Sequence, residues 1–525
     1  MLRTEVAIIG AGLAGVLAAA AAARSGAQVL LIDRGGMGLG SNSAMSNGNF
    51  CGPTSQYTLE EYVADTIRAG RGLNRVSWVE RVGQEVPASF AFLAEMGVKL
   101  APYSNYYLAP TPKPDVFRGA GFMATLAASL RAEKNLERLG GVQVRRIVMD
   151  GGRATGLEGL DAGGRAVRVA AKAVVLAAGG AGAVYAVNDN MKAIMGQGYA
   201  LAAQAGLPLW DMEFVQFYPL VLVEPGLPKV MLYPRYPQGT RLINAAGQDI
   251  LARSGIADVN QGIIELRDRL SAAMAREAAA GPVRVDFTGV AEEHWSQYPL
   301  AMLNKMRFDF RHKPVAVMPG AHFCMGGVQA GPDGSTDIPG LFACGEMLWG
   351  MHGANRRGGN ALTECVVSGR LTGLGAAAYA GKRGAPQPAQ EDTAPLAAQP
   401  AERGGAELRA LRQRLREVAW QRAGIERREQ DLALGQSELA AWQEGLARLP
   451  VSGPRPQWLR WDLECAGLFL SAVLSASRAR QETRGALLRT DYPEADDGAC
   501  LKNSRLELQP QGGWSISHHP VEADH

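Results

Sequence analysis

The sequence predicts an α/β protein built on a parallel sheet, with an inserted domain and a C-terminal helical domain. A strand–helix–strand unit with a glycine-rich turn occupies residues 5–33. Apolar strand patterns resume at 173–177 and 341–343, and helical periodicity dominates 408–449 and 458–483. Strand–helix–strand units imply a parallel sheet. At 525 residues the chain exceeds what one hydrophobic core usually organises, so several domains are expected.

The order of these patterns gives the expected domain bounds. The first segment of the nucleotide-binding domain spans 1–217, and its second segment spans 319–383. In 218–318 the glycine-rich strand character gives way to mixed helix and loop, which predicts an inserted capping domain. Residues 384–404 are rich in Pro, Ala and Gln without periodicity, which is typical of a linker. Residues 405–525 are expected to form helices followed by an irregular tail.

Composition argues against several classes of function. The 54 Lys and Arg against 51 Asp and Glu give a net charge of +3, no reason to expect nucleic acid as a partner. The six cysteines are scattered without a C-x-x-C pair, so neither disulfides nor a metal site is predicted. No stretch reaches the roughly 20 apolar residues of a membrane span. We therefore expect a cytoplasmic protein with no direct membrane insertion, at most peripheral to a membrane through a partner.

Gly10, Gly12 and Gly15 form G-x-G-x-x-G between the first strand and the first helix. The glycines permit a tight turn and let a pyrophosphate approach the helix N-terminus. Asp33 ends the next strand, where a carboxylate accepts hydrogen bonds from adenosine ribose hydroxyls. A lone glycine pattern is weak evidence, but the strand, helix and acid together predict dinucleotide binding. This unit alone leaves FAD and NAD both open.

Two further segments favour FAD. V-V-L-A-A-G-G at 174–180 and I-P-G-L-F-A-C-G-E at 338–346 resemble the second and third flavin contacts of glutathione-reductase-like flavoproteins. The resemblance implies a glutathione-reductase-type Rossmann FAD domain, with Glu346 binding the ribityl chain. The structural alternative for Glu346 is an ordinary acid at a helix N-terminus.

Five motifs narrow the resemblance to one family. P-G-A-H-F-C-M-G-G at 319–327 and H-G-A-N-R-R-G-G-N-A-L at 352–362 resemble H-x-x-M-G-G and H-G-A-N-R-x-G-x-N-[SA]-L. These are motifs of the succinate dehydrogenase, fumarate reductase and L-aspartate oxidase flavoproteins. D-M-E-F-V-Q-F at 211–217, A-G-R-G-L-N at 69–74 and E-T-R-G-A at 482–486 are similar to further motifs of that family. The resemblance extends over nearly the whole chain.

The resemblance implies a carboxylate-binding site. His322 and Arg356 match the residues that hold a substrate carboxylate in the family, and the planar fork of a guanidinium suits a carboxylate. The structural alternatives are a core histidine and a surface ion pair. Arg267, in L-R-D-R-L-S, takes the place of the family's proton donor. Against that role, Glu265 and Arg269 would form an ordinary i,i+4 pair on a solvated helix face.

The site residues that the resemblance implies fall into three sets. The catalytic residues are expected to be Arg267, His322 and Arg356. The substrate-binding residues are expected to be His322, Arg356, Tyr218 and His352. The cofactor-binding residues are expected to be Gly10, Gly12, Ala14, Gly15, Asp33, Arg34, Ser41, Asn42, Ser43, Asn47, Gly48, Ala178, Gly179, Gly180, Glu346, Asn360, Ala361 and Leu362.

Two departures from the family pattern bear on chemistry. Family members with a covalent flavin have S-H-T where this chain has S-N-S, so Asn42 replaces the histidine that bonds to the flavin and FAD is expected to be non-covalent. F-Y-P-L replaces F-H-P-T, and the family's T-E-x-x-R relay falls on Leu232, Tyr233 and Tyr236. The second carboxylate site is thereby lost at Tyr218 and Leu232. We expect a substrate with one carboxylate and an uncharged far end, unless Arg235 or Arg241 replaces the lost donors.

The resemblance implies a hydride transfer between flavin N5 and the carbon next to a substrate carboxylate, in the sense of C–C desaturation or enoate reduction. Two alternatives stay open: an L-aspartate oxidase, and an electron-transfer subunit whose substrate site has degenerated. The chain lacks cluster ligands of its own. It is therefore expected to exchange electrons with oxygen, with a soluble carrier, or with an iron–sulfur or other electron-transfer partner subunit.

Overall fold

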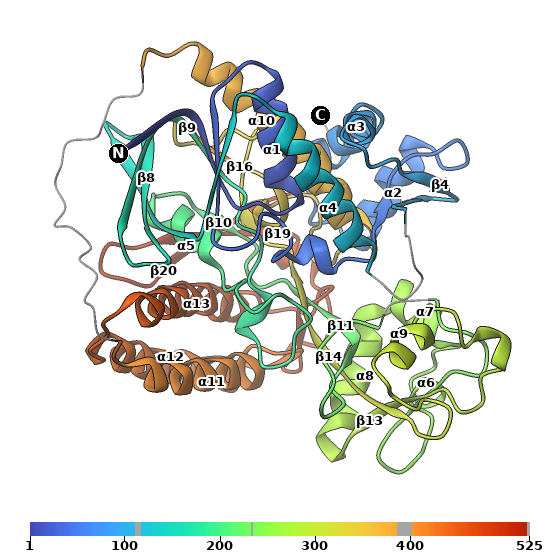
Figure 1. Ribbon diagram of the computed structural model, residues 1–525. Coiled ribbons are helices and arrows are strands. Elements are labelled where there is room, and N and C mark those ends of the chain that lie inside the picture. The colour runs from blue at the N-terminus through green and yellow to red at the C-terminus, as the bar shows by residue number, and fades with distance from the viewer. Residues whose placement is uncertain (111–116, 233–234, 386–401, 522–525) are drawn as a thin grey trace.

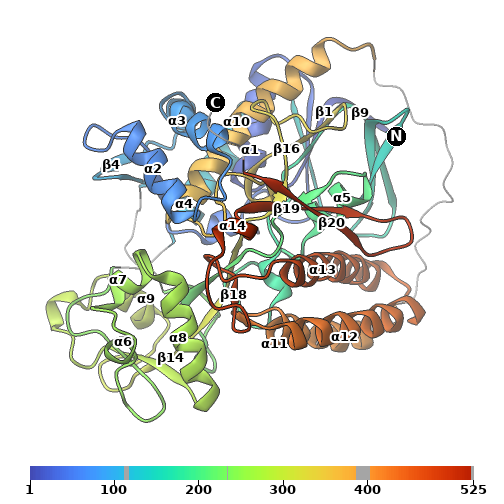
Figure 2. The ribbon, with the colours of Figure 1, turned by 180° about the vertical axis from the view of Figure 1, so that it is seen from behind.

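A computed structural model describes residues 1–110, 117–232, 235–385 and 402–521. Figure 1 shows a large domain that holds the N-terminal segments (blue and teal), a helical bundle (orange and red) beside it, and a smaller green lobe. Seen from behind, the lobe and the bundle are again distinct (Figure 2), and Arg276 of the lobe forms an ion pair with Glu426, which follows the first helix of the bundle. The molecule is therefore divided into three regions.

The large domain is built on a seven-stranded sheet. Its strands are β1 (Leu2–Ile9), β2 (Val29–Asp33), β6 (Leu136–Gly140), β7 (Val142–Asp150), β8 (Arg153–Asp161), β9 (Ala166–Leu176) and β16 (Leu341–Ala343). Their order is β6-β2-β1-β9-β8-β7, and β16 pairs with β9. Val174 of β9 pairs in parallel with Ala7 on one side and with Leu341 on the other. The predicted return of both later strands to the first sheet is confirmed, and with it the α/β class.

The first helix, α1 (Leu13–Arg24), is unusually rich in alanine because another helix packs closely against it. In α10 (Asn360–Gly381), a Cβ added at Gly369 would come within 2.4 Å of the Ala14 carbonyl oxygen. At Gly373 the corresponding distance to the Ala18 oxygen is 2.3 Å. Small residues on both helices are therefore required for this packing. It fixes the N-terminus of α1, where the glycine-rich turn lies.

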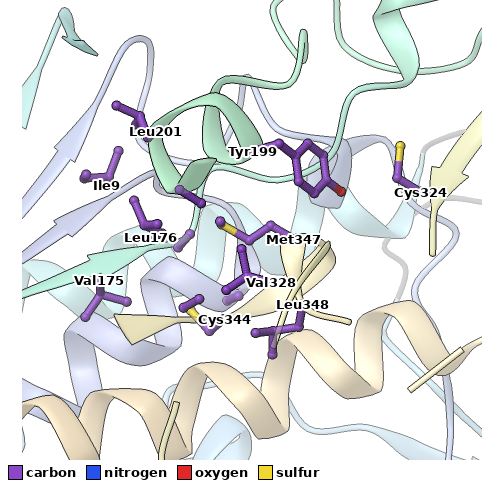
Figure 3. Packing of buried hydrophobic residues seen from close by; sticks show 14 of the residues in the cluster. Ile9, Val175, Leu176, Tyr199, Leu201, Cys324, Val328, Cys344, Met347 and Leu348 are labelled. Carbon is purple, nitrogen blue, oxygen red and sulfur yellow. The ribbon is translucent and has the colours of Figure 1, made fainter. Parts of the chain in front are cut away.

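Figure 3 shows the core beside the sheet, where Ile9, Val175 and Leu176 pack below Tyr199 and Leu201 of α5 (Gln197–Gln204). All five side chains are almost completely buried. Each large apolar side chain buried in this way contributes roughly 1.5–3 kcal/mol. The sheet end that carries the glycine-rich turn is thus rigid.

The rest of the large domain packs against α1 and α10. Its elements are β3 (Asn49–Cys51), α2 (Leu59–Ala69), α3 (Val76–Glu95), β4 (Ala101–Tyr103), β5 (Tyr106–Leu108) and α4 (Arg118–Ser129). A capping box begins α2: the Thr58 side chain accepts from the Glu61 amide, and the Glu61 carboxylate accepts from the Thr58 amide.

The green lobe is the inserted region, and it has its own sheet and core. The sheet order is β11 (Val215–Leu222), β14 (Val315–Cys324), β13 (Val283–Asp286) and β12 (Arg241–Ile243). Its helices are α6 (Ile250–Arg253), α7 (Val259–Ile264), α8 (Arg267–Ala280) and α9 (Leu300–Lys305). The antiparallel pair β11 and β14 runs from the large domain into the lobe (Figure 1). The predicted bounds at 218 and 318 fall inside these two strands and stay predictions.

The C-terminal bundle consists of α11 (Gly405–Arg422), α12 (Glu429–Arg448) and α13 (Pro454–Ala479). The expectation of an irregular tail is wrong, because β19 (Lys502–Leu508) and β20 (Trp514–Pro520) form a hairpin. β19 adds to β10 (Leu209–Trp210), which pairs with β15 (Gly327–Val328). The small elements of this region are β17 (Glu426–Arg427), β18 (Leu488–Arg489) and α14 (Asp497–Cys500). Polar Asn503 and Ser504 are buried in β19, where the Asn503 amide donates to Asp211 and the Ser504 hydroxyl donates to Glu213, and their polarity hid the strand pattern.

The predicted linker at 384–404 lies mostly outside the described residues. Within the described part of the chain, no helix has the length and apolar character needed to cross a membrane.

Candidate active site

The three glycines of the first turn have different surroundings. A Cβ at Gly10 would lie 2.3 Å from the Ala177 carbonyl oxygen, and one at Gly15 would lie 1.9 Å from the Gly10 oxygen. A Cβ at Gly12 would have 3.7 Å to its nearest neighbour, in Ser41. Gly10 and Gly15 therefore permit close packing, whereas the space in front of Gly12 suits a pyrophosphate at the helix N-terminus.

The acid that ends β2 supports the glycine turn. Asp33 Oδ2 accepts from the Ala11 amide at 3.0 Å, and Oδ1 accepts from the Gly35 amide at 2.8 Å. The guanidinium of Arg34 forms a bidentate pair with Asp462 of α13, at 2.7 and 2.9 Å, and its contact with the cofactor stays a prediction. Arg34 thus joins the large domain to the bundle.

The segment around Ser41–Ser43 lies against the N-terminus of α1. Ser43 Oγ accepts from the Leu13 amide at 3.1 Å, and Ser41 donates to the Gly38 oxygen. Asn42, in the 3₁₀ turn Asn42–Met45, donates to Asn190 Oδ1 at 2.6 Å and accepts from the Met191 amide at 2.9 Å. Asn42 is thereby held by the loop that precedes α5.

Two amide oxygens near this segment are buried and lack hydrogen-bond partners among the described residues: Asn47 Oδ1 and Asn360 Oδ1. Gly48, beside the first, has φ of 67°, and Asn360 begins α10 together with Ala361 and Leu362. The start of a long helix carries partial positive charge. These groups fit a polar ligand between the two helix N-termini.

Glu346 lies between the second and third predicted flavin contacts. It belongs to the turn Gly345–Met347 that follows β16, and a Cβ at Gly180 would lie 2.1 Å from its Oε1. A side chain at residue 180 would therefore displace the Glu346 carboxyl, which lies close to residues 178–180 after β9. Burial raises the pKa of Glu346 to about 7, and its Oε1 accepts only weakly from the Cys324 amide, at 3.3 Å. A half-buried carboxyl with so few donors suits the hydroxyls of a ribityl chain.

The predicted carboxylate site lies where β11, β14 and α8 meet the segment that precedes α10. Arg356 is 7% exposed, and its Nε has no hydrogen-bond partner in the described part of the chain. Its Cζ lies 4.8 Å from the centroid of the Phe323 ring. Burial and then the charge of Arg267 lower the pKa of Arg356 to about 9. The surface ion pair considered for Arg356 is excluded by this burial.

Arg267 begins α8 and points into the same site. Its Nη1 donates to Gln216 Oε1 at 3.0 Å, its Nε donates to the Ile263 oxygen, and its Cζ lies 5.4 Å from the Tyr218 ring centroid. Burial lowers the pKa of Arg267. The alternative i,i+4 pair is not formed, because Arg269 donates to the Ser254 oxygen.

The sequence interpretation gave no role to Gln216, although it stands in the D-M-E-F-V-Q-F motif. Its side chain is 1% exposed and donates to Asn355 Oδ1 at 2.7 Å and to the Arg356 oxygen at 2.9 Å. With its own oxygen bound to Arg267, Gln216 fixes the two arginines relative to one another. In the sequence, the position of Gln216 within that motif was the signal that could have revealed this role.

His322 on β14 has a partner that the sequence did not indicate. His322 Nδ1 lies 2.7 Å from Asp189 Oδ2, and its ring lies 5.5 Å from that of Tyr218. The bridge between Asn188 and Ala321 brings the loop of Asp189 beside β14. No motif surrounds Asp189, so only the fold reveals it. His322 is thus a paired histidine facing the arginines and not an isolated core residue.

His352, also predicted to bind substrate, is 2% exposed and has other partners. Its Nε2 lies 2.9 Å from Glu364 Oε2, and its ring meets the edge of Phe323 with centroids 5.0 Å apart. Trp78 Nε1 donates to the other oxygen of Glu364. His352 thus supports Phe323 from behind, whereas His322, Arg356 and Arg267 lie on the side of Phe323 that faces the site.

The far side of the site has no free cation in the part of the chain that the structure describes. Tyr218 and Tyr236 both donate their hydroxyls to the Leu232 oxygen, the former at 2.8 Å. Tyr233 lies outside the described residues. Arg235 donates to the Tyr103 hydroxyl at 2.7 Å, and Arg241 lies 3.8 Å from Asp286. Neither arginine replaces the lost donors here.

Comparisons with known proteins agree with this geometry. The model of the FAD binding domain family matches residues 5–362, and that of the fumarate reductase flavoprotein C-terminal domain matches 412–525. An L-aspartate oxidase of Caulobacter vibrioides is 31% identical over 513 residues, 93% of each chain. A fumarate reductase (CoM/CoB) chain of Methanothermobacter marburgensis is 27% identical and covers 97% of this chain and 98% of its own. A solved quinol fumarate reductase chain of E. coli superposes with TM-score 0.86 at 25% identity, over 100% of this chain and 98% of that one.

The site and fold define an FAD-binding flavoprotein with a C-terminal helical domain. The chain belongs to the family of fumarate reductase, succinate dehydrogenase and L-aspartate oxidase flavoproteins, as its motifs predicted. FAD is its cofactor.

Proposed function

We propose that the protein is an FAD-dependent oxidoreductase of a carboxylic acid, in which a hydride moves to or from the C–C bond next to the carboxylate. The observation that supports this is Arg356, a buried cation without a carboxylate partner among the described residues. Arg267 and His322 lie beside it. A buried unpaired charge is costly, so its retention favours an anionic ligand.

Bound FAD would supply the hydride acceptor or donor. Gly10, Gly12 and Gly15 would hold its pyrophosphate, Asp33 the adenosine ribose and Glu346 the ribityl chain. Asn42, held by Asn190 and Met191, is not a nucleophile toward a flavin methyl carbon, so the cofactor would be non-covalent.

The chain's own residues would divide the remaining work. Arg356 and His322 would hold and polarise the carboxylate, and Gln216 would keep Arg267 at the reacting carbon. An arginine is a reluctant acid, but burial lowers the pKa of Arg267 and so brings it nearer to a useful value. The inserted lobe would exclude water over the site.

The far wall supports a substrate with one carboxylate. Tyr218, Leu232 and Tyr236 are buried there, with both hydroxyls used by the Leu232 carbonyl. A second carboxylate against this wall would lose its hydration without gaining donors, at roughly 1–3 kcal/mol per unpaired group. Fumarate would therefore be a poor substrate compared with a monocarboxylic 2-enoate.

Reduction of fumarate and of a set of monocarboxylic 2-enoates by reduced viologen tests this, compared by kcat/KM. We expect the best enoate to exceed fumarate by about 5- to 150-fold, which corresponds to the 1–3 kcal/mol above. Arg235→Ala is a matched control, since its guanidinium contacts Tyr103 and should not change the ratio. A clear preference for fumarate would refute the one-carboxylate proposal.

A second candidate is L-aspartate oxidase, because relatives at 30–31% identity bear that name. It predicts iminoaspartate and hydrogen peroxide from L-aspartate with oxygen as acceptor. A coupled peroxidase assay distinguishes the two activities. A degenerate site, as in a protein that only carries electrons, predicts instead no change in the flavin spectrum with any carboxylic acid.

Electrons for enoate reduction would come from a partner or carrier. Structural relatives include quinol fumarate reductase, a protein named for an electron donor. An iron–sulfur or other electron-transfer subunit is one possible source. Purification from the native host with the flavin spectrum as marker would identify it.

A further inference from the structure

His322 is held by a carboxylate that is almost as buried as the arginines it faces. The side chain of Asp189 is 5% exposed, and its Oδ2 lies 2.7 Å from His322 Nδ1. Asn188 and Asn190 fix the loop on either side: Asn188 Nδ2 donates to the Tyr185 oxygen at 2.8 Å, and Asn190 Nδ2 donates to the His322 oxygen at 3.2 Å. The pair is therefore built into the fold and not a chance contact of mobile side chains.

This contact fixes which nitrogen carries the proton. An ionised carboxylate accepts hydrogen bonds and cannot donate, so Nδ1 must carry the hydrogen. Nε2 is then left as a bare acceptor when His322 is neutral, and becomes a donor only when the ring is an imidazolium. A carboxylate oxygen of a substrate is also an acceptor. It can pair with Nε2 only in the imidazolium form.

The groups around His322 favour the neutral ring before substrate arrives. Burial lowers the pKa of His322 from its ordinary value, Asp189 opposes this shift, and the charges of Arg356, before α10, and Arg267, on α8, add to it. From β11 the Tyr218 ring lies against it and brings no charge. A substrate carboxylate would reverse the balance, because it adds a negative charge beside Nε2.

We propose that Asp189 is a positioning residue that couples carboxylate binding at His322 to the uptake of one proton from solvent. The inference rests on the proposed function, namely that His322 and Arg356 hold the substrate carboxylate. The proton enters at Nε2, which then donates to the carboxylate oxygen, while Nδ1–H stays on Asp189. The bound imidazolium is also placed to stabilise negative charge that develops on the carboxylate during hydride transfer.

The coupling has a sign that can be measured. At a pH between the lowered pKa of the free site and the raised pKa of the complex, binding takes up close to one proton. The dissociation constant then rises about tenfold for each unit of increasing pH. A histidine that donated from Nε2 in its neutral form would bind the same carboxylate without proton uptake.

The test is isothermal titration of the FAD-loaded enzyme with crotonate in buffers of different ionisation enthalpy, at several pH values. The dependence of the heat on the buffer gives the number of protons taken up. In Asp189→Asn, the amide can donate to Nδ1 and leave the hydrogen on Nε2, so we expect uptake near zero and a dissociation constant nearly independent of pH. Flavin content and melting temperature check that the variant folds.

The chain offers a matched control. Asp309 Oδ2 contacts His312 Nδ1 at the same 2.7 Å, but that pair is exposed on the lobe. Asp309→Asn should leave proton uptake and affinity as in the wild type.

Three results would overturn the inference. Crotonate binding by the wild type without proton uptake contradicts the coupling and leaves the carboxylate site intact. Undiminished uptake in a folded Asp189→Asn variant removes Asp189 from the mechanism. Binding of neither crotonate nor fumarate refutes the proposed function, and the inference with it.

Discussion

Two clusters of buried arginines in this molecule have opposite surroundings. Arg480, which is 1% exposed, donates to Glu213 Oε1 at 2.6 Å and to Glu482 Oε1 at 2.9 Å. Burial alone would lower the pKa of Arg480, but Glu213 and Asp211 raise it above its ordinary value. Arg356 is nearly as buried, yet the charge that acts on it most strongly is that of another arginine, and its pKa falls to about 9.

This difference in partners distinguishes a cluster with a structural role from a cluster that we propose binds a ligand. The cluster of Arg480 joins the bundle to the large domain, and Arg484 extends it through Glu482. Both of these cations are matched by carboxylates, so the cluster needs no ligand. In the cluster of Arg356 and Arg267 neither guanidinium forms a hydrogen bond to a carboxylate among the described residues, and a bound substrate carboxylate would supply one. The first two of the predictions that follow each break one of these clusters.

The largest expected effect follows from removing Arg480. Arg480→Ala would leave Glu213 and Glu482 buried without their cation, and breaking such a pair destabilises by about 3–5 kcal/mol. Chemical denaturation followed by circular dichroism measures the change. Arg478→Ala is a control, since Arg478 contacts Glu429 at the surface and should cost far less. Equal losses would show that burial of the Arg480 pairs is not what matters.

Arg356→Lys tests whether the planar guanidinium of Arg356 is needed in the second cluster. Lysine keeps the charge but loses the planar donor pair, so turnover should fall by roughly 2.7–4 kcal/mol of transition-state stabilisation. FAD content should stay at that of the wild type. Steady-state kinetics on the best enoate, beside flavin absorbance, separates the two quantities. Unchanged turnover would return Arg356 to a structural role.

We also predict that the flavin is not covalently bound, and denaturation of the protein tests this. With Asn42 in place of a histidine, acid or heat should release all the yellow colour into the supernatant. Flavin fluorescence that stays with the protein band on a denaturing gel would contradict this.

The smallest effect concerns the pH dependence of Glu346. Its pKa of about 7 lies above that of an unfolded chain, so the protonated form contributes stability at low pH that is lost as pH rises through 7. Between pH 6 and 8 the apoprotein should lose about 1 kcal/mol from this source. Glu346→Gln should lack that loss. If the stability of the wild type and of Glu346→Gln changed equally between pH 6 and 8, Glu346 would be ionised over that whole range, and the prediction would be wrong.

The cofactor side of the fold was largely predictable from sequence, whereas the substrate side was predictable only for His322, Arg356, Arg267 and Tyr218. Gly10, Gly12 and Gly15 report local backbone constraints, and β16 was predicted at 341–343 because its apolar residues pack locally. Asp189 and Gln216 act across long sequence separations, and only the fold brings them to His322 and Arg267.

The C-terminal hairpin was not predicted from the sequence, for a related reason. β19 buries polar Asn503 and Ser504 through side-chain bonds to Asp211 and Glu213, so the usual alternation of apolar residues is absent. The ion pair of Arg34 was also not predictable, because its partner Asp462 belongs to a helix 428 residues further along the chain. Charge pairing over such distances leaves no periodic pattern in the sequence.

The stability of Arg356→Met tests most directly the central claim, that Arg356 is a buried cation held for a substrate carboxylate. Methionine removes an unpaired buried charge at similar volume, so the FAD-loaded variant should melt at the same or a higher temperature than the wild type. It should also lose the saturable change in flavin absorbance that crotonate produces. A variant that melts well below the wild type, as expected for Arg480→Ala, and still binds crotonate would contradict the account.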